Sequence, residues 1–81
     1  MDQELAMPMI GEDIREAKIA KILVREGEYL NSDQTFIEIS TDKVDIELPS
    51  PVSGVVRKIL VREGETVPSE TVLVLVNTPD S

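Results

Sequence analysis

Apolar and polar residues alternate along much of this chain with the period of two that is typical of β-strands. The apolar residues Val44, Ile46 and Leu48 are separated by Asp45 and Glu47, which places one face in a core and the other in water. No long segment repeats its apolar residues at intervals of three and four, and β-branched residues are frequent. We therefore expect an all-β chain with its other main strands at 18–24, 35–39, 55–61 and 71–76, each bounded by Gly, Pro, Asn, Asp or Ser.

The sequence also repeats itself, because the octet KILVREGE occurs at 21–28 and again at 58–65. At the same offset the likeness continues beyond the octet as matched apolar positions: Leu30 with Val67, Phe36 with Leu73, Ile37 with Val74 and Ile39 with Val76. A half-repeat of this size cannot bury its apolar face alone. We therefore predict two similar halves packed about an approximate two-fold axis, as two small antiparallel sheets that form a flattened barrel or sandwich.

The four glycines of the chain also form two matched pairs. Gly27 and Gly64 occupy the octet, whereas Gly11 and Gly54 each end a P-x-x-G sequence. At such positions glycine is expected to supply the positive φ of a tight turn. The Arg-Glu-Gly-Glu part of the octet is interpreted as a solvated turn, so the repeat indicates architecture rather than chemistry.

Two differences break the repeat, and function is expected where they occur. Six extra residues precede the first octet, between Gly11 and Lys21, compared with the stretch that precedes the second octet. The second difference is Thr-Asp-Lys at 41–43, which corresponds to Thr-Pro-Asp at 78–80.

The segment 40–43 links two predicted strands and is short enough for a tight hairpin. Asp42 suits such a turn because its carboxylate can accept nearby backbone N–H bonds. Lys43 would then project into solvent. Since Lys43 lies near the middle of the chain, between the two half-repeats, we expect it at one pole of a pseudo-symmetric molecule whose termini lie at the other pole.

The composition limits the chemistry that the chain can perform alone. Its 81 residues are enough for one domain, expected at 1–77, with a linker or tail beginning at 78–81. The absence of Cys and His removes the thiolate, the commonest general base and the commonest metal ligand. We therefore expect no catalytic residues and no metal site.

The charge and the hydropathy narrow the range of partners. Sixteen acidic residues against eight basic ones give a formal charge of −8, which disfavours nucleic acid and anionic membranes as partners. No apolar run approaches the ~20 residues of a membrane span, and the first residues do not resemble a signal peptide. These properties favour a soluble, intracellular chain or a domain cut from a larger protein.

Three separated sequence elements together point to a known family. They are M-P-M-I-G-E at 7–12, T-D-K-V at 41–44 and E-L-P-S-P-V-S-G at 47–54. With them, the chain resembles the lipoyl domain of the dihydrolipoyl acyltransferases in 2-oxo acid dehydrogenase complexes. The resemblance implies the lipoyl/biotinyl-domain fold, in which two four-stranded antiparallel sheets are related by a quasi two-fold axis. It also implies that lipoic acid is covalently attached, through an amide, to Lys43.

The resemblance further implies partners and recognition residues. The lipoyl group would carry acyl groups and reducing equivalents between a thiamin-dependent 2-oxo acid dehydrogenase, an acyltransferase core and a dihydrolipoyl dehydrogenase. A lipoate-attaching ligase or transferase would load it. The resemblance also implies a monomeric domain in the bacterial cytoplasm or, in a eukaryote, in the mitochondrial matrix. The extra loop at 12–17 is expected beside the lysine turn, where it would help the dehydrogenase to select its carrier. Residues expected to take part in recognition are Glu12, Asp13, Thr41, Asp42 and Val44.

Two other functions stay open at this point. A biotin carrier with biotinyl-Lys43 shares the half-repeat fold, but such carriers typically flank the lysine with methionines, whereas Asp42 and Val44 flank it here. An unmodified structural or interaction module is the other alternative, with no covalent role for Lys43. An enzyme is the least supported reading, for want of a nucleophile, a base and metal ligands.

Overall fold

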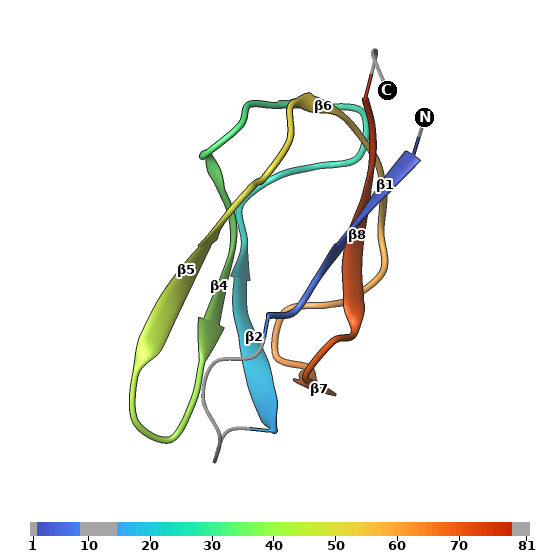
Figure 1. Cartoon of the computed structure of the whole chain (residues 1–81). Coiled ribbons are helices and arrows are strands. Elements are labelled where there is room, and N and C mark those ends of the chain that lie inside the picture. The colour runs from blue at the N-terminus through green and yellow to red at the C-terminus, as the bar shows by residue number, and fades with distance from the viewer. Residues whose placement is uncertain (1, 9–14, 79–81) are drawn as a thin grey trace.

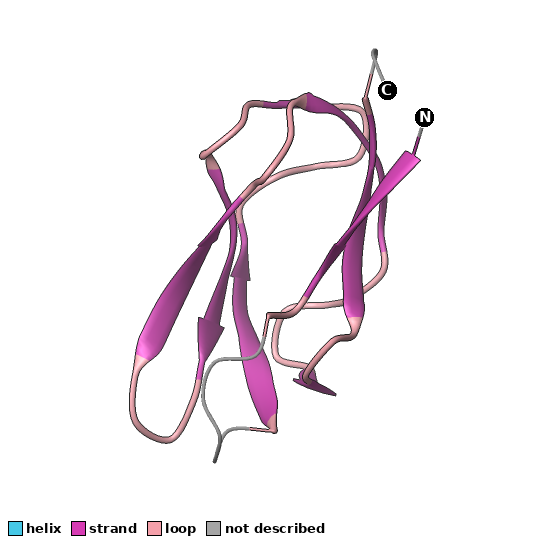
Figure 2. Cartoon of the chain, in the orientation of Figure 1, coloured by secondary structure: helices cyan, strands magenta, loops and turns pink. Residues whose placement is uncertain are grey.

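The chain folds into two layers of β-strands, which Figure 1 shows in chain order and Figure 2 by type of element. The computed structural model describes residues 2–8 and 15–78; none of the elements within these ranges is a helix, so none of them is a membrane-spanning helix. The strands are β1 (Asp2–Ala6), β2 (Glu16–Ile22), β3 (Tyr29–Leu30), β4 (Thr35–Ser40), β5 (Asp45–Pro49), β6 (Gly54–Ile59), β7 (Thr66–Pro68) and β8 (Val72–Asn77).

The pairings between neighbouring strands are antiparallel, and they divide the strands into two sheets. One sheet has the order β1-β8-β6-β3 and the other the order β5-β4-β2-β7. Each strand has its repeat partner at the same place in the other sheet: β1 with β5, β2 with β6, β3 with β7 and β4 with β8. The strands of each half are therefore shared between both sheets. The expected all-β fold of two four-stranded antiparallel sheets with quasi two-fold symmetry is confirmed.

The alternation of apolar and polar residues located five of these eight strands. The predicted segments fall on β2, β4, β5, β6 and β8, with ends displaced by at most two residues. The pattern missed β1, β3 and β7. β3 and β7 contain only two and three residues, which is too short to show a period, and β1 has a single buried residue.

The core is built from the residues that the repeat matches. All four matched apolar pairs that follow the octets are buried, from Leu30 and Val67 to Ile39 and Val76. In β4 and in β8 two consecutive residues are buried, Phe36-Ile37 and Leu73-Val74. A shift in register next to Phe36 marks a β-bulge, and a bulge allows neighbouring side chains to point to the same face. Both halves therefore turn the same face inward, as predicted.

The octet joins the two halves by reciprocal hydrogen bonds. Glu26 Oε2 accepts a bond from the Ile59 N–H, and Glu63 Oε2 accepts one from the Ile22 N–H, both at 2.9 Å. In each bond the donor is the second residue of one octet and the acceptor is the sixth residue of the other. A two-fold contact of this kind requires both copies to keep both residues. The interpretation of this segment as a solvated turn alone was therefore incomplete.

The glycines serve two different purposes. Gly27 and Gly64 have φ values of 90° and 89°, which confirms the positive φ predicted for the octet turns. Gly54 does not have a positive φ, so the prediction for it was wrong. A Cβ at position 54 would instead meet the carbonyl oxygen of Asn77, because β6 and β8 approach closely there. Gly11 lies outside the described residues.

The reciprocal bonds of the octets can be tested by truncating each glutamate. We expect Glu26→Ala and Glu63→Ala each to lower the free energy of unfolding by about 1 kcal/mol, since a backbone N–H loses a charged acceptor. Urea denaturation measures this loss. Glu47→Ala, which removes an exposed carboxylate without a hydrogen bond to another described residue, is the control and should stay within about 0.5 kcal/mol of the unmutated chain. Equal stability of all three variants would show that these two hydrogen bonds do not stabilise the fold.

The two kinds of glycine should respond differently to an added methyl group. Gly27→Ala places an alanine at positive φ, which costs about 1–2 kcal/mol. Gly54→Ala forces a Cβ against backbone, and we expect a loss of more than about 3 kcal/mol, beyond the usual cost of overpacking. Thermal unfolding measures the stability of both variants, and Gly54→Ala should have the lower melting temperature. A Gly54→Ala variant as stable as Gly27→Ala would show that β6 and β8 can separate easily.

Candidate functional site

Lys43 lies in the hairpin turn that connects β4 to β5, as the sequence predicts. Ser40 and Asp45 form the last cross-strand pair before the turn, and the Thr41 N–H donates to the Val44 carbonyl at 2.9 Å. The Lys43 side chain is exposed. The amine therefore stands at the crest of a β-hairpin, outside the packed interior.

The hydroxyl of Thr41 organises this turn. Thr41 Oγ1 accepts bonds from the N–H groups of Val44, at 3.0 Å, and Lys43, at 3.3 Å. It also donates to the Val44 carbonyl at 2.9 Å. The prediction gave the acceptor role to the Asp42 carboxylate, and that prediction was wrong. A Thr at the first position of a turn has its hydroxyl within reach of the N–H groups two and three residues ahead, as an Asp there would have.

Val44 was predicted to share the inward face of Ile46 and Leu48, but it is 49% exposed. Ile46 packs against the core and Leu48 is buried in it, so the alternation holds within β5. β5 begins at Asp45, and Val44 belongs to the turn. An apolar side chain therefore lies exposed directly after the lysine.

A hollow of about 520 Å³ lies beside the turn, and Lys43 is part of its lining. Arg15 and Lys18 contribute positive charge to it, and Glu16 and Asp42 contribute negative charge. These residues surround the turn because β2 pairs with β4 on one side and with β7 on the other. The lysine thus borders a concave surface of mixed charge rather than a flat one.

Sequence reasoning missed the residues that β2 and β7 bring to this hollow. Lys18 and Thr66 lie in neighbouring strands and face each other in register. The repeat held a signal for them, since their counterparts in the other half are the apolar residue Val55 and the aromatic residue Tyr29. Glu12 and Asp13 lie outside the described residues, so their place beside the turn stays a prediction.

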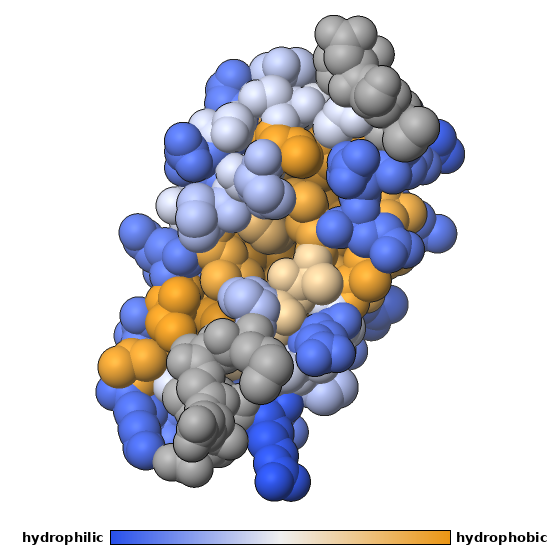
Figure 3. All heavy atoms as spheres, in the orientation of Figure 1, coloured by the Kyte–Doolittle hydropathy of each residue, from blue (hydrophilic) through white to orange (hydrophobic). Residues whose placement is uncertain are grey.

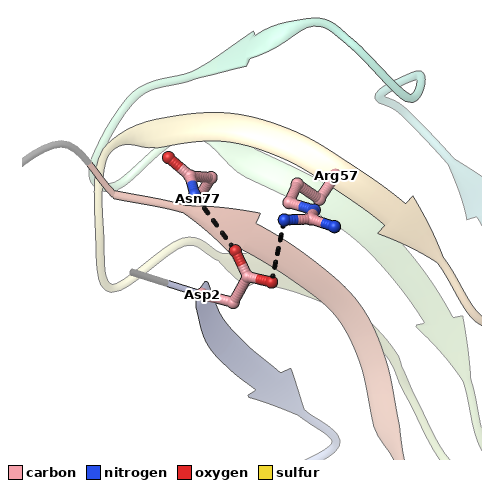
Figure 4. Close-up of polar contacts among 3 residues, drawn as sticks. All are labelled: Asp2, Arg57 and Asn77. Carbon is pink, nitrogen blue, oxygen red and sulfur yellow. Dashed lines mark hydrogen bonds and ion pairs between the residues drawn. The ribbon is translucent and has the colours of Figure 1, made fainter.

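The opposite pole of the molecule is the structural counterpart of this turn. There Asp2 pairs with Asn77 across β1 and β8, and the Asn77 Nδ2 group donates to Asp2 Oδ1 at 3.1 Å (Figure 4). Arg57 forms an ion pair of 3.4 Å with the same carboxylate. At the lysine pole the Ser40 hydroxyl donates to Asp45 Oδ1 at 2.9 Å, in the same relative position. The predicted arrangement is confirmed for the described residues, because the β4–β5 turn lies at the pole opposite the start of β1 and the end of β8 (Figure 1).

Comparison with known proteins agrees with this geometry. The family model described as biotin-requiring enzyme, which covers biotin and lipoyl attachment, matches residues 3–76. The chain belongs to the biotin/lipoyl attachment family. It is 38% identical, over 78 residues, to the dihydrolipoyllysine-residue acetyltransferase component of the pyruvate dehydrogenase complex of Staphylococcus aureus, and equally to that of Staphylococcus epidermidis. The alignment covers 96% of this chain but only 18% of each relative, so the chain spans about a fifth of their length.

Two solved structures share the fold. The lipoyl domain of the 2-oxoglutarate dehydrogenase complex from Azotobacter vinelandii superposes with a TM-score of 0.73 at 30% identity, over 93% of this chain and 96% of that domain. A single-chain, multi-domain long-chain acyl-CoA carboxylase superposes with a TM-score of 0.77 over 99% of this chain and 7% of its own. Its identity is 16%, so this second likeness shows the fold alone. Within the family, the sequence likeness is therefore to lipoyl domains, and a biotin carrier is less supported.

The role of Thr41 predicts a local effect on the turn. We expect Thr41→Val to speed amide hydrogen exchange at Val44 about fivefold, because loss of the hydroxyl costs roughly 1 kcal/mol of hydrogen bonding. Thr41→Ser keeps the hydroxyl and should exchange at the original rate. NMR-detected exchange measures both variants. The same exchange rate in Thr41→Val and the unmutated chain would show that the turn holds without this side chain.

Proposed function

We propose that this chain is a lipoyl carrier domain in which lipoic acid is joined to Lys43 through an amide. The observation that carries the proposal is the position of Lys43, exposed at the crest of a hairpin at the pole opposite the ends of β1 and β8. The likeness to lipoyl domains supports the choice of lipoate. The residues at the site fit the group, since an exposed amine can be reached by an attaching enzyme and no packed side chain has to move.

The hairpin supplies what a mobile carrier group needs. Amide formation removes the charge of Lys43, so the extended side chain is no longer a cation among Arg15, Lys18 and the acids of the hollow. The Thr41 bonds hold the backbone beneath the lysine in one conformation, so only the side chain has to move. When bound, the lipoyl group supplies a dithiolane that accepts acyl groups and electrons.

A carrier on a tether meets each partner at high local concentration. For short flexible links this concentration is in the millimolar range, which free lipoate would lack. We infer that the partners are a lipoate-attaching ligase or transferase, a thiamin-dependent 2-oxo acid dehydrogenase, an acyltransferase core and a dihydrolipoyl dehydrogenase. The names of the relatives support this set. Thr41, Asp42 and Val44 are proposed to be contacted during attachment, with Glu12 and Asp13 in selection of the dehydrogenase.

Peptide mass spectrometry of the protein from its native host tests the attachment. We expect the mass of a lipoyl group on Lys43 and no tryptic cleavage after it, since an amidated lysine is not a cation. Lys21, an exposed lysine in the first octet, should stay unmodified and cleavable. A biotin mass on Lys43 would establish the biotin carrier instead. A bare Lys43 in a host with an active attaching enzyme would establish an unmodified module.

Replacement of the lysine separates carrier function from folding. Lys43→Ala should abolish the acceptance of acyl groups while changing the free energy of unfolding by less than about 0.5 kcal/mol, because the side chain is exposed in a turn. Lys21→Ala should keep full acceptance. Urea denaturation and an acylation assay on both variants provide the two readouts. Marked unfolding of Lys43→Ala would mean that this residue supports the fold rather than carrying cargo.

A further inference from the structure

A groove with an apolar floor opens between the edge strands β1 and β5, at a distance from the lysine turn. Its volume is about 300 Å³, and hydrophobic surface gathers at the centre of the face seen in Figure 3. The floor is formed by Leu5, Phe36 and Leu48, each at most 5% exposed. Phe36 is the only phenylalanine of the chain. A concave apolar site of this kind is a candidate for binding.

The quasi two-fold axis relates the two sides of this groove. Three pairs of lining residues are repeat counterparts: Leu5 with Leu48, Ala6 with Pro49 and Pro8 with Pro51. Ala6 and the three prolines are exposed and form the rim. Proline has no N–H, so the three proline positions of the rim cannot donate to an added strand. The groove is therefore suited to receive side chains rather than to extend a sheet.

The edge strands give the groove a negative border. β1 and β5 contain four carboxylates and no base. Asp2 is paired with Arg57, and Asp45 accepts the Ser40 hydroxyl. The carboxylates of Glu4, which lines the groove, and of its counterpart Glu47 form no hydrogen bond or ion pair with any residue in 2–8 or 15–78. An unpaired carboxylate is thus available on each edge strand.

The negative border of the groove favours a positively charged binding partner. A second copy of this chain is disfavoured, since each copy carries a formal charge of −8. We propose that the groove docks a segment of a partner protein that presents large apolar side chains flanked by Lys or Arg. The apolar side chains cover Leu5, Phe36 and Leu48, and the flanking cations pair with Glu4 and Glu47.

The groove and the lysine turn lie at opposite ends of β5. Asp45 begins β5 next to the turn, whereas Leu48 and Pro49 reach the groove at its other end. A docked partner therefore leaves the lysine free and holds it nearby, which raises the local concentration of whatever Lys43 carries. Docking does not depend on the attached group, so this inference stands apart from the lipoyl assignment.

Titration of the ¹⁵N-labelled, unlipoylated domain with two synthetic peptides tests the groove. We expect KKLFLKK to shift the amide signals of Leu5, Ala6, Phe36 and Leu48, and EELFLEE to leave them unchanged. The double variant Glu4→Gln/Glu47→Gln should bind KKLFLKK about fivefold more weakly, because two exposed ion pairs are lost. Both substitutions lie on exposed positions, so the fold should be retained.

A matched double variant separates docking from general attraction to an acidic protein. Glu28→Gln/Glu65→Gln removes two charges at exposed positions that line neither the groove nor the hollow, and glutamine keeps the Oε1 that accepts the bonds from the Arg25 and Arg62 N–H groups. Its affinity for KKLFLKK should stay within twofold of the original. Equal weakening by both double variants, shifts spread over the whole surface, equal binding of EELFLEE or no shift at the groove residues would each overturn the proposal. None of these outcomes bears on the lipoylation of Lys43.

Discussion

Each half of this chain buries its apolar face only by sharing strands with the other half. Because β1 to β4 are divided between both sheets, neither half forms a sheet of its own. The octets reinforce this exchange, since the Glu26 carboxylate in one half satisfies a backbone donor of the other half, and Glu63 returns the contact. The core, the hairpin and the groove all depend on this reciprocal packing.

Symmetry gives the molecule two poles with the same framework and different contents. At both poles a carboxylate at the start of an edge strand accepts a bond from the last residue of its neighbour, Asp45 from Ser40 and Asp2 from Asn77. At one pole the chain is continuous and presents Lys43 on a turn ordered by Thr41. At the other pole β1 begins and β8 ends. This difference places the amine of Lys43 opposite the start of β1 and the end of β8, which is the arrangement on which the proposed carrier function rests.

The proposed carrier function and the proposed docking assign separate roles to the hollow beside Lys43 and to the groove. The hollow beside Lys43 is of mixed charge, as suits a site that several enzymes contact in turn. The groove on the two-fold axis is apolar with Glu4 on its border, as suits attachment to a basic partner. The hollow and the groove lie at opposite ends of β5, so a partner in the groove need not block the lysine. The affinity for a docked partner can therefore change without a change in the residues around Lys43.

The sequence by itself determined the β class, the paired halves, the buried positions such as Leu30 and Val67, and the lysine at a hairpin tip. These features rest on local periodicity, on repeated letters and on the short link between two strands. Only the tertiary structure decided the exchange of strands between sheets, the bond from the Ile59 N–H to Glu26, the crowding at Gly54 and the groove at Phe36. Each of these joins residues that lie far apart along the chain, and a pattern within one segment does not specify which distant segment it meets.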